Sequence, residues 1–325
     1  MSKRFYTFAK FILCLFATLI LHSNVFAQDK NKTITLVVPF SPGGSTDITA
    51  RSLADKIRPL LGGTIVVENK AGAGGNIGAF AVARANADGN TLLMATSTHV
   101  TNMSLYKNLQ YDFVKDLTPI SRVAFIPNTL VINKDLPVNN LSEFVQYVKD
   151  KKGPVNYGSA GNGTSQHLAG SLFNNMAGGN MVHIPYKAGG PAVMLDLMSG
   201  QVQAYFAPLA EVTSFIDSGK VKVLGVTTKE RSNRYPNVQA INEVMPGYEV
   251  VLWNGILTTA NAPPDQINRI NAAISKALQD PELQKKLADQ GSVPAPNSVA
   301  DFKSFIQKET AKWAELVKIS GAAVE

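Results

Sequence analysis

Glycine-rich segments follow apolar runs at four places in the chain, and the first and third of them are also rich in Ser and Thr. They read VVPFSPGGSTD (37–47), NKAGAGGNIGA (69–79), NYGSAGNGTSQHL (156–168) and PYKAGGPA (185–192). Each lies between an expected strand and an expected helix, so free N–H groups at the helix start point outward. Open α/β sheets place their ligands at this edge. The matched pair 41–47 and 159–165 therefore predicts a two-sided cradle for a small anion, while 69–79 fits a purely structural role equally well.

The segment 156–168 contains no charged residue, so neutral donors and a helix dipole must hold the anion there. We expect Thr164 and Ser165 to donate hydrogen bonds to a ligand carboxylate or to its bridging waters. Because charge-assisted hydrogen bonds contribute about 1.5–3 kcal/mol each, Thr164→Val is expected to weaken binding roughly tenfold or more.

Asp47 is the single acid of the four segments, and it has two interpretations. It pairs with a ligand ammonium, or it faces the N–H groups of its own helix. Lys187 adds positive charge nearby. This composition predicts an anionic ligand without an α-amino group.

Catalytic and metal-binding patterns are missing from the sequence. Gly72, Gly74 and Gly78 miss the GxGxxG spacing because Ile77 stands where the third glycine belongs. The sequence has no GK[ST] phosphate loop and no GxSxG elbow. The histidines outside the leader, His99, His167 and His183, show no metal-ligand spacing. We therefore predict no catalytic residues, no metal and no cofactor.

Residues 1–27 have the pattern of a secretory signal peptide. Three basic residues and no acid occur there, with an apolar run of eleven residues (11–21) and a Val-Phe-Ala ending. That run is too short to span a bilayer. The single cysteine, Cys14, lies inside it, so the exported chain has neither disulfides nor thiolate ligands. Outside the leader, 28 basic residues face 24 acidic ones and are scattered, which argues against nucleic-acid binding.

The elements that position these segments form two cycles of strand and helix. Apolar β-rich runs alternate with helical patterns, which predicts an α/β fold with mainly parallel sheets flanked by helices. We expect strands at 34–38, 64–68 and 91–95, and extended segments at 120–126 and 129–132 separated by Pro127 and Asn128. A second cycle follows from about residue 141. The predicted lobes are residues 28–122 with 250–325, and residues 123–249.

Six segments of the sequence closely resemble the Bug family. They read VVPFSPGGSTDITAR, NKAGAGGNIGA, DGNTLLMATS, NYGSAGNGTSQHLAG, IPYKAGGPA and LWNGILTTANAPP, and they occur in order over nearly the whole exported chain. Bug proteins are periplasmic solute-binding receptors of tripartite tricarboxylate transporters. The resemblance implies a two-lobe periplasmic binding protein of type II, the "Venus flytrap". It also implies a small organic acid in the cleft, contacted by both lobes and through ordered water.

Carried over by position, the resemblance assigns ligand contacts on both sides of the cleft. The first lobe would supply Phe40, Ser41, Gly44, Ser45 and Asp47. The second lobe would supply Ser159, Thr164, Ser165 and His167, with Tyr186, Lys187 and Gly190 at the cleft wall. The family commonly has Tyr-Pro-Ala-Gly-Gly where this chain has residues 40–44, and an acid where it has Gln203, so ligand specificity does not transfer.

The sequence thus predicts a monomeric periplasmic receptor, exported by a cleaved signal peptide. It would capture a small carboxylate between its lobes and deliver it to the membrane permease subunits of a tripartite tricarboxylate transporter. A ligand sensor for a signalling partner is the alternative with the same fold. A secreted hydrolase is the alternative from another class, although the sequence shows no convincing triad or carboxylate pair.

Overall fold

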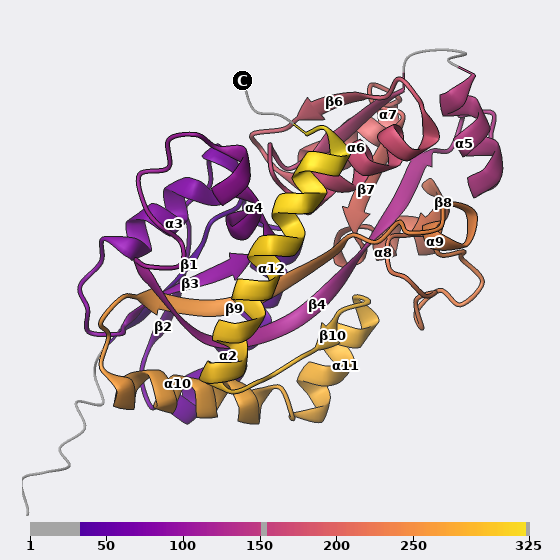
Figure 1. The fold of residues 1–325 in the computed structure, drawn as a ribbon. Helices are drawn as coiled ribbons and strands as arrows, with labels where there is room; N and C mark the ends of the chain where they lie inside the picture. The colour runs from indigo at the N-terminus through magenta and orange to yellow at the C-terminus, as the bar shows by residue number, and fades with distance from the viewer. Residues whose placement is uncertain (1–32, 151–154, 323–325) are drawn as a thin grey trace, which may run out of the picture. The chain divides into compact units, whose positions relative to one another are not determined.

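The structure, a computed structural model, describes residues 33–150 and 155–322 (Figure 1). The leader predicted at residues 1–27 lies outside the described residues. The strands are β1 (Ile34–Val38), β2 (Ile65–Asn69), β3 (Thr91–Thr96), β4 (Leu117–Asn133), β5 (Asn156–Ser159), β6 (Val182–Pro185), β7 (Ala204–Pro208), β8 (Val221–Val226), β9 (Val251–Thr259) and β10 (Val293–Pro294). The helices are α2 (Ser45–Leu61), the short η1 (Ala73–Gly75), α3 (Asn76–Ala83), α4 (Ser97–Leu105), α5 (Leu141–Lys149), α6 (Ser165–Ala177), α7 (Gly190–Ser199), α8 (Leu209–Asp217), α9 (Ile241–Val244), α10 (Pro264–Ala277), α11 (Pro281–Asp289) and α12 (Val299–Ser320).

The strands form a mixed sheet in the order β2-β1-β3-β9-β4-β7-β5-β6, with β8 and β10 also paired to β4. Pairing is parallel where β1 meets β2 and β3, and where β5 meets β6 and β7. It is antiparallel around β4 and β9. The strand–helix units therefore keep the parallel arrangement expected of α/β repeats, and the two long strands join them.

Strand β4 changes partners halfway along its length. Residues 117–127 pair with β9, and residues 128–133 pair with β7 and β8. We call the β1, β2, β3, β9 and β10 part the first sheet half, and the β5–β8 part the second sheet half. The sequence predicted a break at Pro127 and Asn128, whereas the strand runs through. Pro127 lies opposite Val251, the first residue of β9, so its missing N–H falls where that ladder ends.

Helices cover the sheet with their apolar faces. In α2, Leu53, Ile57 and Leu61 recur at helical spacing and are buried against β1 and α10. Helix α12 is capped by Ser298, whose side chain accepts the Asp301 N–H. It packs against α4, α6 and β4 and so lies along both sheet halves (Figure 1).

The sequence pattern predicted most elements but not α4, α8, α9 and α11. Helices α4 and α8 begin at the residue directly after a strand, at Ser97 and Leu209, without a turn to mark the boundary. All four have at most nine residues, so their apolar periodicity covers little more than two turns. Every helix in residues 33–150 and 155–322 is too short or too polar to cross a membrane.

Candidate functional site

A pocket lies where loops from both sheet halves meet. It encloses about 390 Å³ of empty space, part of it open to solvent. It is lined by Phe40, Ser41, Gly44, Ser45, Thr46, Thr96, Thr98, Ala160, Thr164, Ser165, Gln166, Gly189, Gly190, Glu211 and Leu252. Seven of the predicted site residues are among them: Phe40, Ser41, Gly44, Ser45, Thr164, Ser165 and Gly190.

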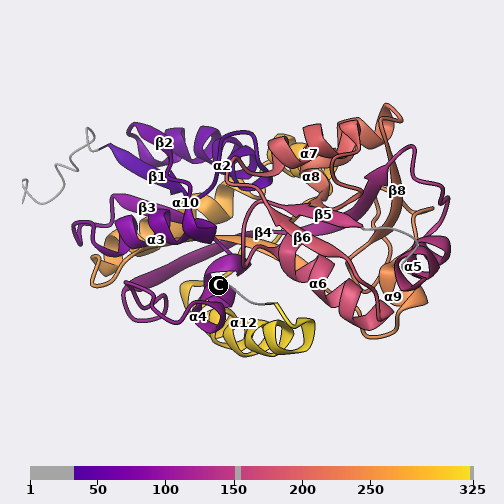
Figure 2. The ribbon, with the colours of Figure 1, turned by 90° about the horizontal axis from the view of Figure 1, so that it is seen from above.

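Four helices, α2, α4, α6 and α7, have their N-terminal ends at this pocket, and two of those ends lack a side-chain cap. Gly44 precedes α2 and Gly189 precedes α7, and neither offers an oxygen to the first free N–H groups. The two starts are close neighbours, since a Cβ on Gly43 would lie 3.7 Å from the Pro191 ring (Figure 2). Uncapped helix starts carry partial positive charge, so the pocket favours an acceptor oxygen even without a cation.

Thr164 acts as the N-cap of the third helix, α6. Its Oγ1 accepts the His167 N–H at 3.4 Å and donates its own proton to the Gly161 carbonyl at 2.7 Å. Ser165 Oγ lies 3.4 Å from Asn128 Oδ1. In this arrangement the proton of Thr164 is already used within the loop. The donors that α6 leaves free for a ligand are the N–H groups of Ser165 and Gln166.

Asp47 does not line the pocket, because its carboxylate is engaged from three sides. Arg51 Nε donates to both oxygens at 3.0 Å, Gly43 N–H donates at 3.0 Å, and Asn69 Nδ2 donates at 2.9 Å. Burial raises the pKa of Asp47, but hydrogen bonds from these three groups outweigh it, so the pKa lies below its usual range. Asp47 therefore faces Arg51, Asn69 and the Gly43 N–H just before α2, and not the N–H groups of its own helix.

His167 and Ser159 also turn away from the pocket. The rings of His167 and His183 stack with centroids 3.9 Å apart, and Ser159 Oγ lies 2.6 Å from His183 Nε2. The two histidines line a different cavity, together with Tyr157. Burial lowers the pKa of His167 to about 4 and that of His183 to about 3, the latter helped by the neighbouring His167. Both are neutral at pH 7 and supply no cation for an anion.

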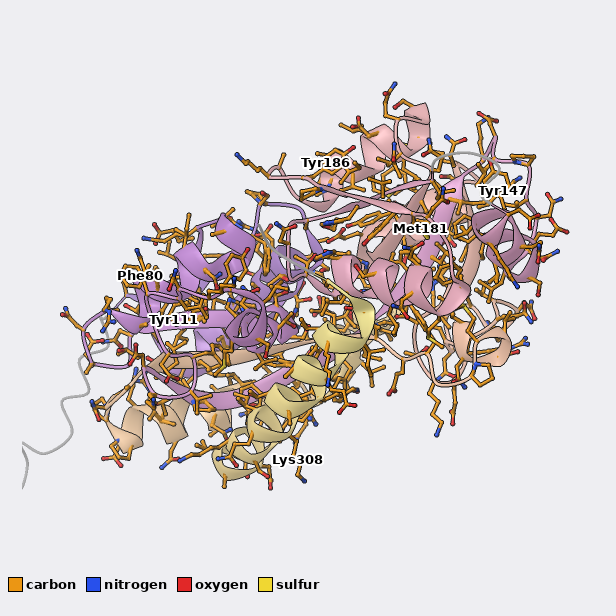
Figure 3. All side chains as sticks on the ribbon, turned by 45° about the horizontal axis from the view of Figure 1, so that its top comes forward. Phe80, Tyr111, Tyr147, Met181, Tyr186 and Lys308 are labelled. Atoms are coloured by element: carbon orange, nitrogen blue, oxygen red, sulfur yellow. The ribbon has the colours of Figure 1, made fainter. Side chains whose placement is uncertain are left out.

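Tyr186 and Lys187 occupy the outer wall. The Tyr186 hydroxyl donates to Asp196 Oδ2 at 2.6 Å, and Figure 3 labels this residue on the second sheet half, away from Phe80 and Tyr111 of the first. Lys187 lines a second cavity that shares Phe40, Ser41, Ala160 and Gly189 with the pocket. Its charge therefore stands at the approach to the pocket.

The residues that the sequence reasoning missed are Thr46, Thr96, Thr98, Ala160, Gln166, Gly189, Glu211 and Leu252. The most consequential is Glu211, whose Oε1 accepts the Ser45 N–H at 2.8 Å and whose Oε2 accepts the Tyr205 hydroxyl at 2.7 Å. Asp47 is the single acid of the four loops, but the acid that lines the pocket is Glu211. Glu211 comes from α8, outside the four loops. The spacing of Leu209, Val212 and Ile216 was the signal that could have placed it on a helix facing the sheet.

The pocket offers binding groups rather than reactive ones. None of the histidines in the described part of the chain lines it. Within residues 33–150 and 155–322, no group of His, Cys, Asp and Glu side chains is arranged to hold a metal ion. What remains is a pocket of hydroxyls, an amide, helix starts and one carboxylate, with Phe40 and Leu252 as its apolar surface.

Known proteins resemble this chain along most of its length. The family model for the tripartite tricarboxylate transporter family receptor matches residues 49–322. Protein BugT of Bordetella pertussis (strain Tohama I) is 34% identical over 297 residues, which cover 90% of this chain and 91% of BugT.

Two solved structures are similar as well. The structure of Rpa4515 from R. palustris with adipate is 31% identical, with a TM-score of 0.87, over 92% of this chain and 99% of that one. The structure of MatC (Rpa3494) from Rhodopseudomonas palustris with bound malate is 31% identical, with a TM-score of 0.83, over 88% of this chain and 98% of that one.

Proposed function

The chain belongs to the tripartite tricarboxylate transporter receptor family, and from this membership we propose that it captures a small carboxylate between two lobes and delivers it to a membrane transporter. The predicted resemblance to Bug proteins is confirmed, as is the α/β fold of periplasmic binding proteins. The chain is thus a solute-binding receptor of a periplasmic family.

One observation of the pocket carries the proposal. Residues of both sheet halves line it, and its polar groups are hydroxyls, an amide, helix starts and the Glu211 carboxylate, without a basic side chain. Such a pocket binds a carboxylate through neutral donors and the partial charges of helices α6 and α7. The structures with adipate and malate contain acids of this chemical class.

We propose that the predicted lobes, 28–122 with 250–325 and 123–249, move about the crossing strands β4 and β9. A ligand that touches both lobes stabilises the closed state by its greater affinity for that state. Six of the seven predicted residues that line the pocket contact the ligand, while Thr164 holds the start of α6. Asp47, Ser159, His167 and Tyr186 hold their loops in place, and Lys187 attracts the anion at the entrance.

Mass spectrometry of the compound released from gently purified protein tests this function. The expected result is one carboxylic acid per chain. A sugar, a nucleotide or a metal ion in its place would contradict the proposal. Loss of uptake of that acid in a deletion strain, restored by the wild-type gene, tests delivery to a transporter; unchanged uptake would contradict delivery while leaving binding intact.

A further inference from the structure

Glu211 is the charged side chain of the pocket, and it connects the two sheet halves there. It lies in the first turn of α8, directly after β7. Its Oε1 accepts the N–H of Ser45, the first residue of α2, and its Oε2 accepts the Tyr205 hydroxyl. The N-terminal end of α2, an anion-binding position by its dipole, is therefore already occupied by a carboxylate of the protein.

Two glycines make room for this carboxylate. A Cβ on Gly190 would run into Glu211 Oε2 and approach the Tyr205 hydroxyl, and a Cβ on Gly44 would lie 3.4 Å from Oε1. The uncapped starts of α2 and α7 thus enclose the Glu211 carboxylate between them. Since Glu211 is only partly buried and lines the pocket, a ligand in the pocket meets it directly.

Neither hydrogen-bond partner of Glu211 neutralises its charge. The Ser45 N–H, the Ser45 hydroxyl and the Tyr205 hydroxyl are neutral donors, and the lining residues include no lysine, arginine or histidine. A carboxylate has about four acceptor positions, so these three donors leave Glu211 able to accept about one more. Burial raises the pKa of Glu211, partly offset by its hydrogen bonds from Ser45 and Tyr205, which reflects how little compensation the site provides for the charge.

We propose that Glu211 is the specificity-determining residue of the pocket, selecting organic acids that carry a hydroxyl or ammonium donor over the same acids without it. The proposal rests on the function proposed above. The ligand carboxylate goes to the start of α6, and the donor faces Glu211. An acid without the donor leaves the remaining acceptor position of Glu211 unfilled, and a second carboxylate in that place is repelled by the Glu211 charge.

Calorimetric titration with matched acids tests this assignment. The four-carbon set of the panel is succinate, L-malate and L-aspartate, which are the plain, hydroxy and amino acid of one length. The five-carbon set is glutarate, 2-hydroxyglutarate and L-glutamate. Adipate is added as a longer plain acid, and all titrations are made at pH 8. The wild-type protein is expected to bind a hydroxy or amino acid at least tenfold more tightly than the plain acid of the same length. Glu211→Gln, nearly identical in shape, is expected to reduce that preference to about threefold or less by weakening the donor acids and strengthening the plain ones.

Asp217→Asn is the matched control. Asp217 is on the same helix and accepts a tyrosine hydroxyl, that of Tyr235, at 2.8 Å, but it does not line the pocket. It should keep the wild-type preference, and circular dichroism checks that both variants fold. Equal binding of plain and donor acids by the wild type, or an unchanged preference in Glu211→Gln, overturns the role of Glu211 and leaves the proposed function standing. If no acid of the panel binds to the wild type, the carboxylate function itself is refuted together with this inference.

Discussion

Replacing Thr164 by valine separates a structural role of this residue from direct ligand binding. Valine keeps the shape and the β-branch but loses the hydroxyl, and with it two interactions. These are the bond accepted from the His167 N–H at 3.4 Å and the bond donated to the Gly161 carbonyl at 2.7 Å. The backbone of Thr164 is extended, with φ −67° and ψ 157°, a conformation that valine adopts without strain.

The size of the effect follows from these two bonds. Loss of an N-cap costs about 0.5–2 kcal/mol, and the long distance to the His167 N–H places this cap toward the lower end. Gly161 is only partly buried, so water replaces part of its lost donor. Together the two losses lower the free energy of unfolding by about 1–2 kcal/mol. Each kcal/mol lowers the melting temperature by roughly 2–4 °C in a chain of 150–250 residues, and by somewhat less in this longer chain.

Ligand affinity is expected to fall by less than tenfold, a smaller loss than the sequence alone suggested. The reason is that the proton of Thr164 is directed at Gly161 and not into the pocket. Thermal unfolding and calorimetry with the tightest-binding acid of the panel measure both quantities. Thr164→Ser keeps the hydroxyl and should stay close to wild type. A hundredfold loss of affinity in Thr164→Val at nearly unchanged melting temperature would refute the reasoning, because it would show a direct contact.

Two further variants probe the α2 side of the pocket. Asp47→Asn is expected to lower stability by about 1.5–3 kcal/mol at pH 7, since charge-assisted hydrogen bonds are lost. The folded pKa of Asp47 lies below its usual value, so this stabilisation is present above about pH 4 and disappears as pH falls through the folded pKa. The melting temperatures of wild type and variant should therefore converge in acid. A constant difference between them at all pH values would contradict the assignment. Ser45→Pro removes the N–H that Glu211 accepts at a first helical position where proline is tolerated, and should weaken acid binding tenfold or more by calorimetry. Ser45→Ala keeps that N–H and should change affinity less than threefold. Equal effects of the two substitutions would show that the hydrogen bond from the Ser45 N–H to Glu211 does not contribute to acid binding.

The loops of the site could be predicted from the sequence because their physics is local. Glycine followed by Ser or Thr before a helix specifies a strand–helix turn, and two such turns, at 43–46 and 163–165, predicted the edge of the sheet where the pocket lies. The start of α2 at Ser45, directly after Gly43 and Gly44, and the Ser298 cap of α12 follow from the same local physics.

What the sequence could not reveal depends on tertiary contacts. The engagement of Asp47 by Asn69 joins residues 22 positions apart, and that of Glu211 by Ser45 joins residues 166 positions apart. Neither pairing leaves a trace in local spacing. Strand β4 continues past Pro127 for a similar reason, since its partners exchange there and come from distant parts of the chain.

A crystal structure of the protein with the tightest-binding acid of the panel tests the central claim most directly. The account predicts a carboxylate of the acid within hydrogen-bond distance of the Ser165 or Gln166 N–H, with further contacts from Ser41 or Thr46 across the pocket. An acid held by one sheet half alone, or in the outer cavity beside Lys187, would contradict it.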